Sequence, residues 1–365
     1  MADPIRLGIV GCGAIAPIHA NAVLALEGAV LAGVQDHDLA QAETFAASLG
    51  VPTFTTLHEL CREVDAVLIC TPSGTHAEIA NAAMELGVDV LVEKPLDTEL
   101  ARAESVVHTA ARTGRIAGVV SQHRFARPIQ EVREVVQSGR WGRMLIGDAK
   151  VKWYRTQAYY DSGKWRGTRR WDGGCLMNQS IHTIDMLLWV MGPVKAVNGL
   201  CRTMSHDMEC EDVGMALVEF ESGAVGTIMG TTVAFPGFQE RFEVHGERGS
   251  AIVEADRIIA WHENEAIEDG SKYGGGVMVQ PAPNVPSSVG TALGDDDTIG
   301  WGRQHRLQIE DFVAAVRDRR TSFLPVEEGL APLKTILAIM KSSVEGGRRV
   351  ELSELEAAAT ESVWV

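Results

Sequence analysis

The feature that most constrains the fold is an alternation of apolar runs and helix-like segments over about the first 125 residues. The apolar runs are rich in Val, Ile and Leu, and segments with helical spacing of apolar residues separate them. Strands that are apolar on both faces are typical of a parallel sheet with helices on both sides. We therefore expect an α/β domain with a parallel sheet over residues 1–123.

The pattern changes in the remainder of the chain, residues 124–365. One helical segment around residues 181–192 is followed by a succession of strands with short turns such as Glu221-Ser222-Gly223. This succession predicts a second α/β domain with a large, open, mainly antiparallel sheet and helices on one face. Residues 264–300 are rich in Gly, Pro, Ser and Asp and predict a long surface loop, for which functional and disordered interpretations stay open.

Charge and composition exclude several classes of function. The 33 basic and 49 acidic residues give a formal net charge of −16, which disfavours nucleic-acid and anionic-membrane partners. No apolar run approaches the roughly 20 residues of a spanning helix, and the N-terminal residues do not have the pattern of a secretory signal. Six cysteines without a C-x-x-C pair predict reduced thiols in a cytoplasmic protein, and no Cys/His cluster has ligand spacing, so we expect no metal site.

A glycine motif follows the first apolar run and precedes the first helix. It reads Gly11-Cys12-Gly13-Ala14-Ile15-Ala16. In this context the glycines allow a tight turn and close approach of a pyrophosphate to the helix N-terminus, which predicts a Rossmann domain. Asp36 ends the second apolar run, where a carboxylate accepts hydrogen bonds from the adenosine ribose and repels a 2′-phosphate. We expect NAD rather than NADP; a solvated strand-end role for Asp36 is the alternative.

With these motifs the chain resembles the Gfo/Idh/MocA family of sugar and polyol oxidoreductases, from about residue 5 to residue 352. The resemblance depends on the glycine motif, the segment ending at His76, the tripeptide Glu93-Lys94-Pro95, the segment Gly173–Asp185 and the helix from Asp311. It implies a Rossmann domain, a C-terminal domain with an open sheet, a nicotinamide cofactor, an active site between the domains, and homodimers or homotetramers formed through the sheet. The residues that we expect at the cofactor are Gly11, Gly13, Ala14, Ile15, Asp36, Thr71, Pro72, His76, Glu93, Lys94 and Gln122. For His76, a helix-start histidine without chemistry is a second interpretation.

Two residues are candidates for the chemistry. Lys94 follows a parallel strand, at the edge of the sheet where ligands bind, and its ammonium can stabilise developing alkoxide charge. The resemblance implies that this lysine is catalytic. His182 shares a helical stripe with Asn178 and Asp185, and its imidazole suits reversible proton transfer. We assign His182 as base and Lys94 as the group that polarises the hydroxyl; the reverse assignment stays open, as does a purely structural His182–Asp185 pair.

Asn178 departs from the family pattern. Inositol-dehydrogenase-like members have an aspartate four residues before the histidine, whereas the asparagine here cannot take a proton but can bind a substrate hydroxyl. An asparagine at this position occurs among family members that act on C3 of nucleotide-sugar uronates and related glycosides. The substitution therefore weakens an assignment as inositol dehydrogenase.

Aromatic and basic residues between 153 and 171 predict a sugar site. Aromatic faces suit sugar C–H surfaces and arginine suits a carboxylate or phosphate, which favours an acidic sugar or nucleotide-sugar. Pairing of these arginines with surface carboxylates or a second subunit is the alternative. The expected substrate contacts are Lys94, Arg124, Tyr154, Trp165, Arg166, Asn178 and His182. His305 matches a position near the site in relatives.

These expectations combine into one function: NAD-dependent oxidation of a secondary hydroxyl, with C3 preferred, on a sugar, sugar acid, glycoside or nucleotide-sugar. A second class is an NAD-dependent glycosidase that acts by transient C3 oxidation and elimination. A third is a non-catalytic NAD-binding sensor, against which the presence of both Lys94 and His182 argues.

Overall fold

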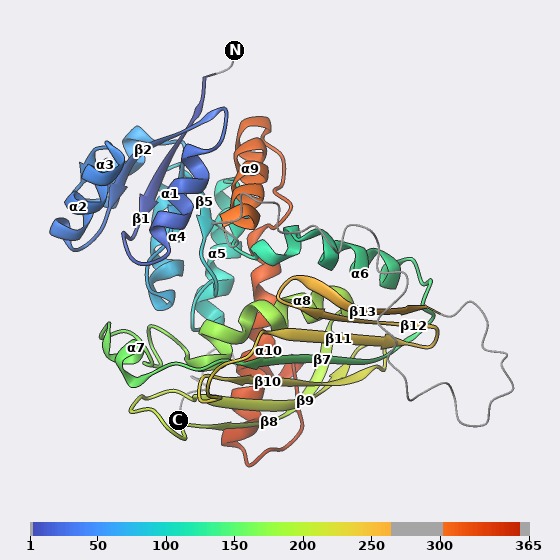
Figure 1. Cartoon of the computed structure of the whole chain (residues 1–365). Helices are drawn as coiled ribbons and strands as arrows, with labels where there is room; N and C mark the ends of the chain where they lie inside the picture. The colour runs from blue at the N-terminus through green and yellow to red at the C-terminus, as the bar shows by residue number, and fades with distance from the viewer. Residues whose placement is uncertain (1–2, 264–301, 358–365) are drawn as a thin grey trace, which may run out of the picture. The chain divides into compact units, whose positions relative to one another are not determined.

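The computed structural model describes residues 3–263 and 302–357 and divides them into two compact units (Figure 1). The first unit contains residues up to Gln122, the segment Lys164–Gly173 and the described residues of 302–333. The second contains His123–Gly163, the described residues of 174–263, and those from Lys334 onward. The main stretch of the first unit ends at Gln122, next to the expected boundary at 123. The other two segments of this unit, Lys164–Gly173 and the described residues of 302–333, lie within the range 124–365 that the sequence analysis expects for the second domain.

A six-stranded parallel sheet forms the centre of the first unit, in the strand order β3-β2-β1-β4-β5-β6. Its strands are β1 (Ile5–Val10), β2 (Ala29–Gln35), β3 (Thr53–Phe54), β4 (Ala66–Ile69), β5 (Asp89–Val92) and β6 (Ala117–Val119). Every residue of β4, β5 and β6 is buried, as expected for strands that are apolar on both faces. The predicted Rossmann architecture is confirmed.

Helices lie between these strands along the chain and after them, and some have a clear capping residue. They are α1 (Ala16–Leu24), α2 (Leu39–Leu49), α3 (Leu57–Glu63), α4 (His76–Glu85), α5 (Leu100–Thr113) and, later in the chain, α9 (Gly302–Asp318), with short 3-10 turns at Ser73–Thr75, Gln122–Phe125 and Val326–Gly329. Asp38 caps α2 through its side chain, and Thr56 with Glu59 forms a capping box on α3. Gly114 ends α5 in the left-handed conformation that glycine adopts without strain.

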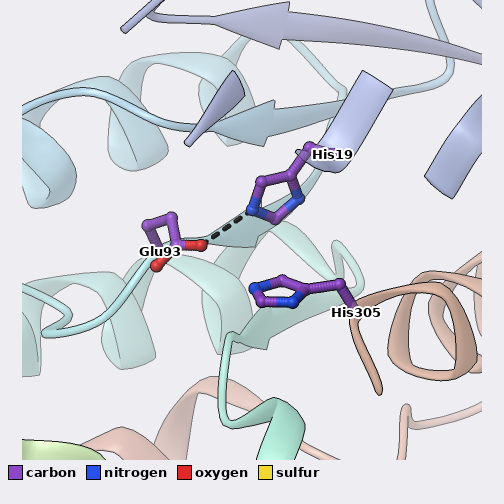
Figure 2. Close-up of side chains that lie close together, drawn as sticks. All are labelled: His19, Glu93 and His305. Atoms are coloured by element: carbon purple, nitrogen blue, oxygen red, sulfur yellow. Dashed lines mark hydrogen bonds and ion pairs between the residues drawn. The ribbon is translucent and has the colours of Figure 1, made fainter. Parts of the chain in front are cut away.

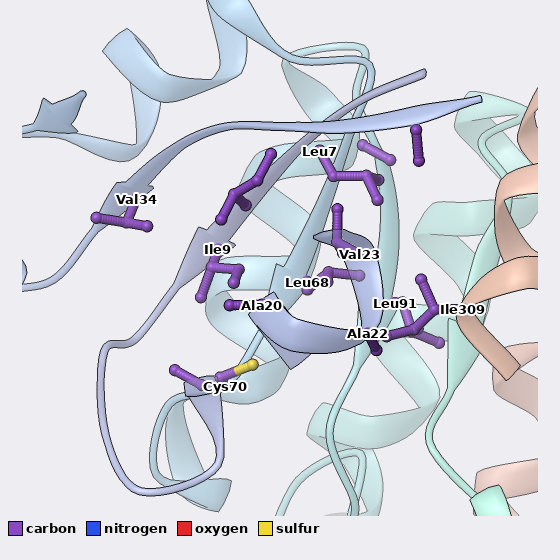
Figure 3. Close-up of a cluster of buried hydrophobic side chains, with 14 of the residues drawn as sticks. Leu7, Ile9, Ala20, Ala22, Val23, Val34, Leu68, Cys70, Leu91 and Ile309 are labelled. Carbon is purple, nitrogen blue, oxygen red and sulfur yellow. The ribbon is translucent and has the colours of Figure 1, made fainter. Parts of the chain in front are cut away.

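The core of the first unit lies between the sheet and helices α1 and α9 (Figure 3). Leu7, Ile9 and Leu68 from the strands pack with Val23 of α1, and Ile309 of α9 joins them from a distant part of the chain. Gln308 of α9 also bonds backbone groups of Val119 and Ser121 at the end of β6. Helix α9 is therefore an integral part of the dinucleotide-binding fold.

An eight-stranded mixed sheet forms the second unit, in the order β13-β12-β11-β7-β10-β9-β8-β14. The strands are β7 (Met144–Lys152), β8 (Val194–Arg202), β9 (Val213–Phe220), β10 (Val225–Thr231), β11 (Arg241–Gly246), β12 (Gly249–Glu254), β13 (Arg257–Glu263) and β14 (Val350–Glu351). All neighbours are antiparallel except β7 and β10, so the expected mainly antiparallel sheet is confirmed. The sequence did not predict the short edge strand β14.

The second unit also contains α6 (Arg127–Gln137), α7 (Gln157–Asp161), a π-helical turn at Leu176–Ser180, α8 (Ile181–Met191), α10 (Leu330–Val344), which begins in the first unit, and α11 (Ser353–Ala357). One face of the sheet packs on α8 and α10 through glycines: a Cβ at Gly147 would lie 2.9 Å from Met191, and one at Gly199 would lie 2.4 Å from the Ile339 carbonyl oxygen. The other face exposes large apolar side chains, with Leu217 63% and Met215 43% exposed.

Three further expectations concern the cysteines, membrane-spanning helices and the loop at 264–300. All six cysteines are free thiols, as predicted. Among the described helices, none combines the length and apolar character that crossing a membrane requires. The predicted loop at 264–300 lies outside the described residues.

Candidate active site

The glycine motif forms the turn between β1 and α1. Gly11 has a φ of 93°, and a Cβ there would lie 2.8 Å from the backbone of Cys70, so only glycine fits. A Cβ at Gly13 would meet nothing within 4 Å, and no side chain caps the N-terminus of α1. Open space beside an uncapped helix N-terminus suits the pyrophosphate of a dinucleotide.

Asp36 is buried at the end of β2, and its carboxylate accepts the backbone N–H of Cys12 at 2.7 Å. Its second oxygen accepts the N–H of Asp38 at 2.9 Å and lies 2.7 Å from the exposed ring of His37. The carboxylate therefore ties the glycine turn to β2. The predicted ribose contact would be an additional role for the same group.

His76 joins two of the sequence motifs. Its ring is buried at the start of α4, with Nδ1 2.6 Å from the carbonyl oxygen of Pro95 and Nε2 2.8 Å from that of Thr71. Both ring nitrogens are engaged with backbone carbonyls, so the structure favours the interpretation in which His76 positions loops. The cofactor contacts predicted for Thr71, Pro72 and His76 stay predictions.

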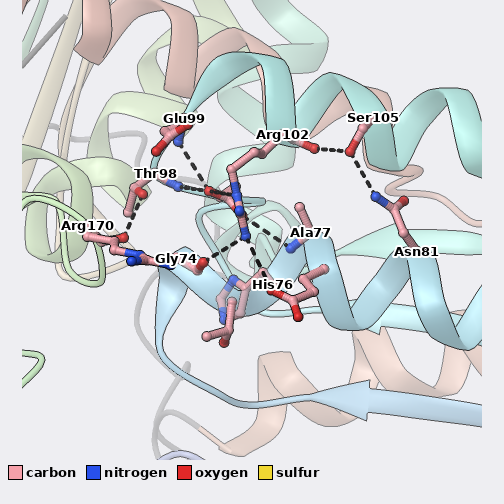
Figure 4. Close-up of polar contacts among 12 residues, drawn as sticks. Gly74, His76, Ala77, Asn81, Thr98, Glu99, Arg102, Ser105 and Arg170 are labelled. Atoms are coloured by element: carbon pink, nitrogen blue, oxygen red, sulfur yellow. Dashed lines mark hydrogen bonds and ion pairs between the residues drawn. The ribbon is translucent and has the colours of Figure 1, made fainter. Parts of the chain in front are cut away.

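A second polar network holds the same loops together (Figure 4). Asp97 is fully buried and accepts hydrogen bonds from Arg102 Nε at 3.2 Å and from the backbone of Thr98. Arg102 also donates to the Gly74 carbonyl oxygen at 3.0 Å, and Thr98 donates to that of Arg170 at 2.9 Å. The loop after β4, the loop after β5 and the segment Lys164–Gly173 are thus bonded to one another.

Glu93 lies in a buried cluster with His19 and His305 (Figure 2). Its Oε1 lies 2.7 Å from Nε2 of His19, and its Oε2 accepts the backbone N–H of Lys94 at 3.1 Å. Burial alone would raise the pKa of Glu93, but the hydrogen bond and charge of His19 lower it to about 2. Burial would likewise lower the pKa of His19, yet Cys70 and Glu93 outweigh it and raise that pKa to about 10.

The three side chains of this cluster place donor atoms within 4.8 Å of one another, a set that could in principle surround a metal ion. The opposite charges of His19 and Glu93 already compensate each other, and we interpret the cluster as an ion pair. The residues come from three distant segments, so neither the pair nor the cluster is visible as sequence spacing.

Lys94 lies two residues after the end of β5 and is partly exposed. Burial lowers the pKa of its ammonium, the charges of Glu93 and Asp172 oppose this, and that of Arg166 adds to it. Asp172 is buried and accepts the backbone N–H of Gly167 at 2.6 Å. The charges of the predicted substrate residue Arg166 and of Asp172, which the sequence analysis missed, therefore both act on the Lys94 ammonium.

Trp165 and Arg166 both belong to the segment Lys164–Gly173 of the first unit, and the guanidinium of Arg166 lies 4.4 Å from the centre of the Trp165 ring. Gln122 is buried at the end of the main stretch of that unit, with an Oε1 that has no hydrogen-bond partner. Tyr154 lies in the second unit, 38% exposed, with its ring edge on Phe235. The predicted contacts of these residues with substrate or cofactor stay predictions.

The second unit presents His182 at the start of α8, partly exposed. Asn178 lies in the preceding π-helical turn, so the single α-helical stripe that we predicted through Asn178, His182 and Asp185 is interrupted after Asn178. Ile184 and Leu188 of α8 are buried. Isolated π turns are frequent at functional sites.

Asp185 forms a buried ion pair with Arg124. Nε of Arg124 lies 2.8 Å from Asp185 Oδ2 and Nη2 lies 2.5 Å from Oδ1, and both side chains are nearly inaccessible to solvent. Two donors of Arg124 are thus engaged within the protein, and Asp185 ties α8 to the Gln122–Phe125 turn. The ring beside His182 is that of His123, with centroids 5.0 Å apart; the sequence analysis missed His123 and its partner Asp256.

Comparison with known proteins agrees with this architecture. The model of the oxidoreductase family with an NAD-binding Rossmann fold matches residues 5–121, and that of the GFO/IDH/MocA C-terminal domain matches residues 129–252. Inositol 2-dehydrogenase of Rhizobium meliloti is 26% identical over 348 residues, which cover 93% of this chain and 97% of the relative. D-glucoside 3-dehydrogenase of Escherichia coli is 29% identical over 363 residues, which cover 96% and 98%.

A solved structure extends the likeness to three dimensions. The WlbA dehydrogenase from Bordetella pertussis, crystallised with NADH and UDP-GlcNAcA, has a TM-score of 0.82 to this chain at 29% identity, covering 96% of this chain and 98% of that one. The two family models match the chain in the same order as its two sheets. The Rossmann-fold model covers every strand of the six-stranded sheet. The chain therefore belongs to the Gfo/Idh/MocA family and is an NAD-binding oxidoreductase that acts on CH–OH groups.

Proposed function

We propose that this enzyme oxidises a secondary hydroxyl of a sugar or sugar derivative, with Lys94 and His182 as the catalytic residues. The observation that carries the proposal is Lys94 itself: an ammonium at the end of a parallel strand, with its pKa lowered by burial, within an NAD-binding fold. NAD, held by the Gly11–Ile15 turn and Asp36, supplies the hydride acceptor when bound.

The two residues have complementary roles. The Lys94 ammonium donates a hydrogen bond to the reacting oxygen and stabilises its negative charge as the proton leaves. His182 accepts that proton on an imidazole nitrogen, because its ordinary pKa range permits transfer in both directions near neutral pH. Asn178 cannot share the proton, so its amide is assigned to a neighbouring substrate hydroxyl.

We infer C3 of a pyranose as the preferred position and an acidic sugar, glycoside or nucleotide-sugar as the substrate. Asn178 supports C3, and so does the likeness to D-glucoside 3-dehydrogenase of Escherichia coli. The acidic substrate is supported by Arg166 beside Lys94 and by the UDP-GlcNAcA bound in the WlbA structure. Arginine recognises carboxylate and phosphate groups through its planar fork.

The experiment is to incubate the purified protein with NAD and a panel of polyols, free sugars, sugar acids, glycosides and nucleotide-sugars, and to follow both NADH and glycoside cleavage. We expect NADH formation with a C3 hydroxyl substrate, and none with the matching 3-deoxy compound. Glycoside cleavage without net NADH would contradict the dehydrogenase and support the glycosidase. NAD binding with neither reaction across the panel would contradict the proposed substrate class.

We also propose that the chain forms homodimers or homotetramers through the open face of the second sheet. Leu217, Met215 and Val225 are exposed on adjacent strands of that face, an apolar arrangement typical of protein interfaces. Light scattering after size exclusion should give a dimer or tetramer for the natural protein and a smaller species for Leu217→Arg. A natural protein that elutes as a monomer at high concentration would contradict this proposal.

A further inference from the structure

His123 lies beside the proposed base in the second unit. The rings of His123 and His182 have centroids 5.0 Å apart and planes inclined at 60°. Nδ1 of His123 lies 2.8 Å from both oxygens of Asp256, and the side chains of the pair are only 16% and 20% exposed. Because a carboxylate can only accept, Nδ1 of His123 donates, which fixes the ring's orientation toward His182.

Asp256 occupies the turn between β12 and β13 in an uncommon backbone conformation. Ala255 has a φ of 47° and Asp256 a φ of 58°, both in the left-handed region that non-glycine residues rarely adopt. Tight hairpin turns require this conformation and commonly place glycine, asparagine or aspartate in it, so Asp256 suits its position. The turn presents the Asp256 carboxylate to Nδ1 of His123.

The segment that contains His123 is fixed on α8 at a second point. Arg124, the next residue, forms the buried ion pair with Asp185, which lies one turn after His182 on the same helix. Gln130 also bonds the carbonyl oxygen of Arg124 at 3.0 Å. Two consecutive residues therefore contact α8 at neighbouring turns, which leaves the His123 ring little freedom to move away from His182.

The charges around His123 favour its protonated form. Burial alone would lower the pKa of His123, but the charge and hydrogen bond of Asp256 and the charges of Glu240 and Asp185 outweigh burial and raise it. The positive charge is thus retained to higher pH than on an exposed histidine. A cation at 5.0 Å disfavours a second positive charge on the neighbouring ring.

We propose that His123 and Asp256 are a positioning pair for His182: they orient its ring and place beside it a positive charge that keeps it unprotonated and able to accept the substrate proton. The inference rests on the proposed function, in which His182 is the base. In this proposal Asp256 acts on the base through His123, and Asn178 takes no part in the proton transfer.

The first test needs no substrate. NMR titration of the histidine ring carbons, with His182 assigned through His182→Gln, compares the natural protein with His123→Phe and Asp256→Asn. His123→Phe retains the ring packing without the charge, and Asp256→Asn retains the size without the carboxylate. In His123→Phe the titration midpoint of His182 should rise by about 1 pH unit, because the neighbouring cation is lost while the Asp256 carboxylate stays. Asp256→Asn should lower the titration midpoint of His123 itself, because its ion pair is lost. The exposed His262→Phe is the matched control and should leave the His182 midpoint unchanged.

The second test is the pH dependence of kcat/KM. The acidic limb reports the base, so His123→Phe should move it to higher pH by the same amount, with the affinity for NAD unchanged. An unshifted His182 midpoint and limb in His123→Phe, in an enzyme that still requires His182, would overturn this inference alone. Undiminished turnover of His182→Ala would instead overturn the proposed function.

Discussion

The two units hold their candidate catalytic residues in different ways. In the first, Lys94 follows a strand of a parallel sheet, and loops bonded by His76, Asp97 and Arg102 surround its motif. In the second, His182 lies on a helix that is packed on a glycine-lined sheet face, with His123 beside it. Strand ends position the first residue, and helix packing positions the second.

The two sheets also differ in how their faces are buried. The central strands of the first sheet are buried throughout, so that sheet has no free face. The second sheet buries one face against helices and exposes Leu217 and Met215 on the other. A parallel sheet uses all its surface to form the fold, whereas a mainly antiparallel one retains a face for association.

The largest effect should come from the buried ion pair of the second unit. Arg124→Met leaves Asp185 charged and buried, which costs about 3–5 kcal/mol of unfolding free energy. Hydrogen exchange resolved by peptide should show the loss in α8 and not in α1. Equal losses in both units would break the distinction between them.

A smaller effect is expected in the first unit, whose stability should depend on pH through His19. The pKa of His19 is raised in the folded state to about 10, so the stabilisation is complete below about pH 6.5 and is lost as pH rises toward 10. We expect α1 and β5 to lose about 2–4 kcal/mol over that range in hydrogen exchange. His19→Gln should remove this dependence, while the exposed His108→Gln should retain it.

Packing of the segment Lys164–Gly173 on the first unit gives the next effect. A Cβ on Gly74 would lie 1.9 Å from the carbonyl oxygen of Arg170. Gly74→Ala should therefore displace this segment at a cost of about 1–3 kcal/mol and make it accessible to limited proteolysis. If the segment stays protected from the protease in this variant, the contact between Gly74 and Arg170 does not hold it in place.

The smallest effect concerns the cofactor. Asp36→Asn retains an acceptor for the Cys12 N–H but loses the charge, so we expect NAD to bind about tenfold more weakly and the discrimination against NADP to fall. Equilibrium titration of both cofactors measures this. If the affinity for NAD is unchanged, Asp36 only supports the turn.

The fold could be predicted from the sequence because its signals are local. Apolar runs, helical spacing and the glycine motif each lie within one segment, so the parallel Rossmann sheet and the mainly antiparallel second sheet could be predicted from them. The parallel pairing of β7 with β10 could not be predicted, because it joins strands about 80 residues apart.

The site was predictable only in part. Lys94 and His182 stood out through their motifs, but His19, His123 and Asp256 did not, because their partners are 74 and 133 residues distant. The role of Arg124 could not be predicted either, because it depends on a distant partner: its guanidinium bonds Asp185. Tertiary packing, which no local pattern encodes, decides such pairings.

The central claim is that Lys94 and His182 are the catalytic residues for oxidation of the substrate hydroxyl. The most direct test is single-turnover NADH formation with the substrate identified by the panel, in the natural protein, Lys94→Ala and His182→Ala, after equilibrium NAD binding has been shown to be intact in each. The account predicts a loss of about 100-fold or more in the rate for both variants. A natural rate of NADH formation in either variant would contradict it.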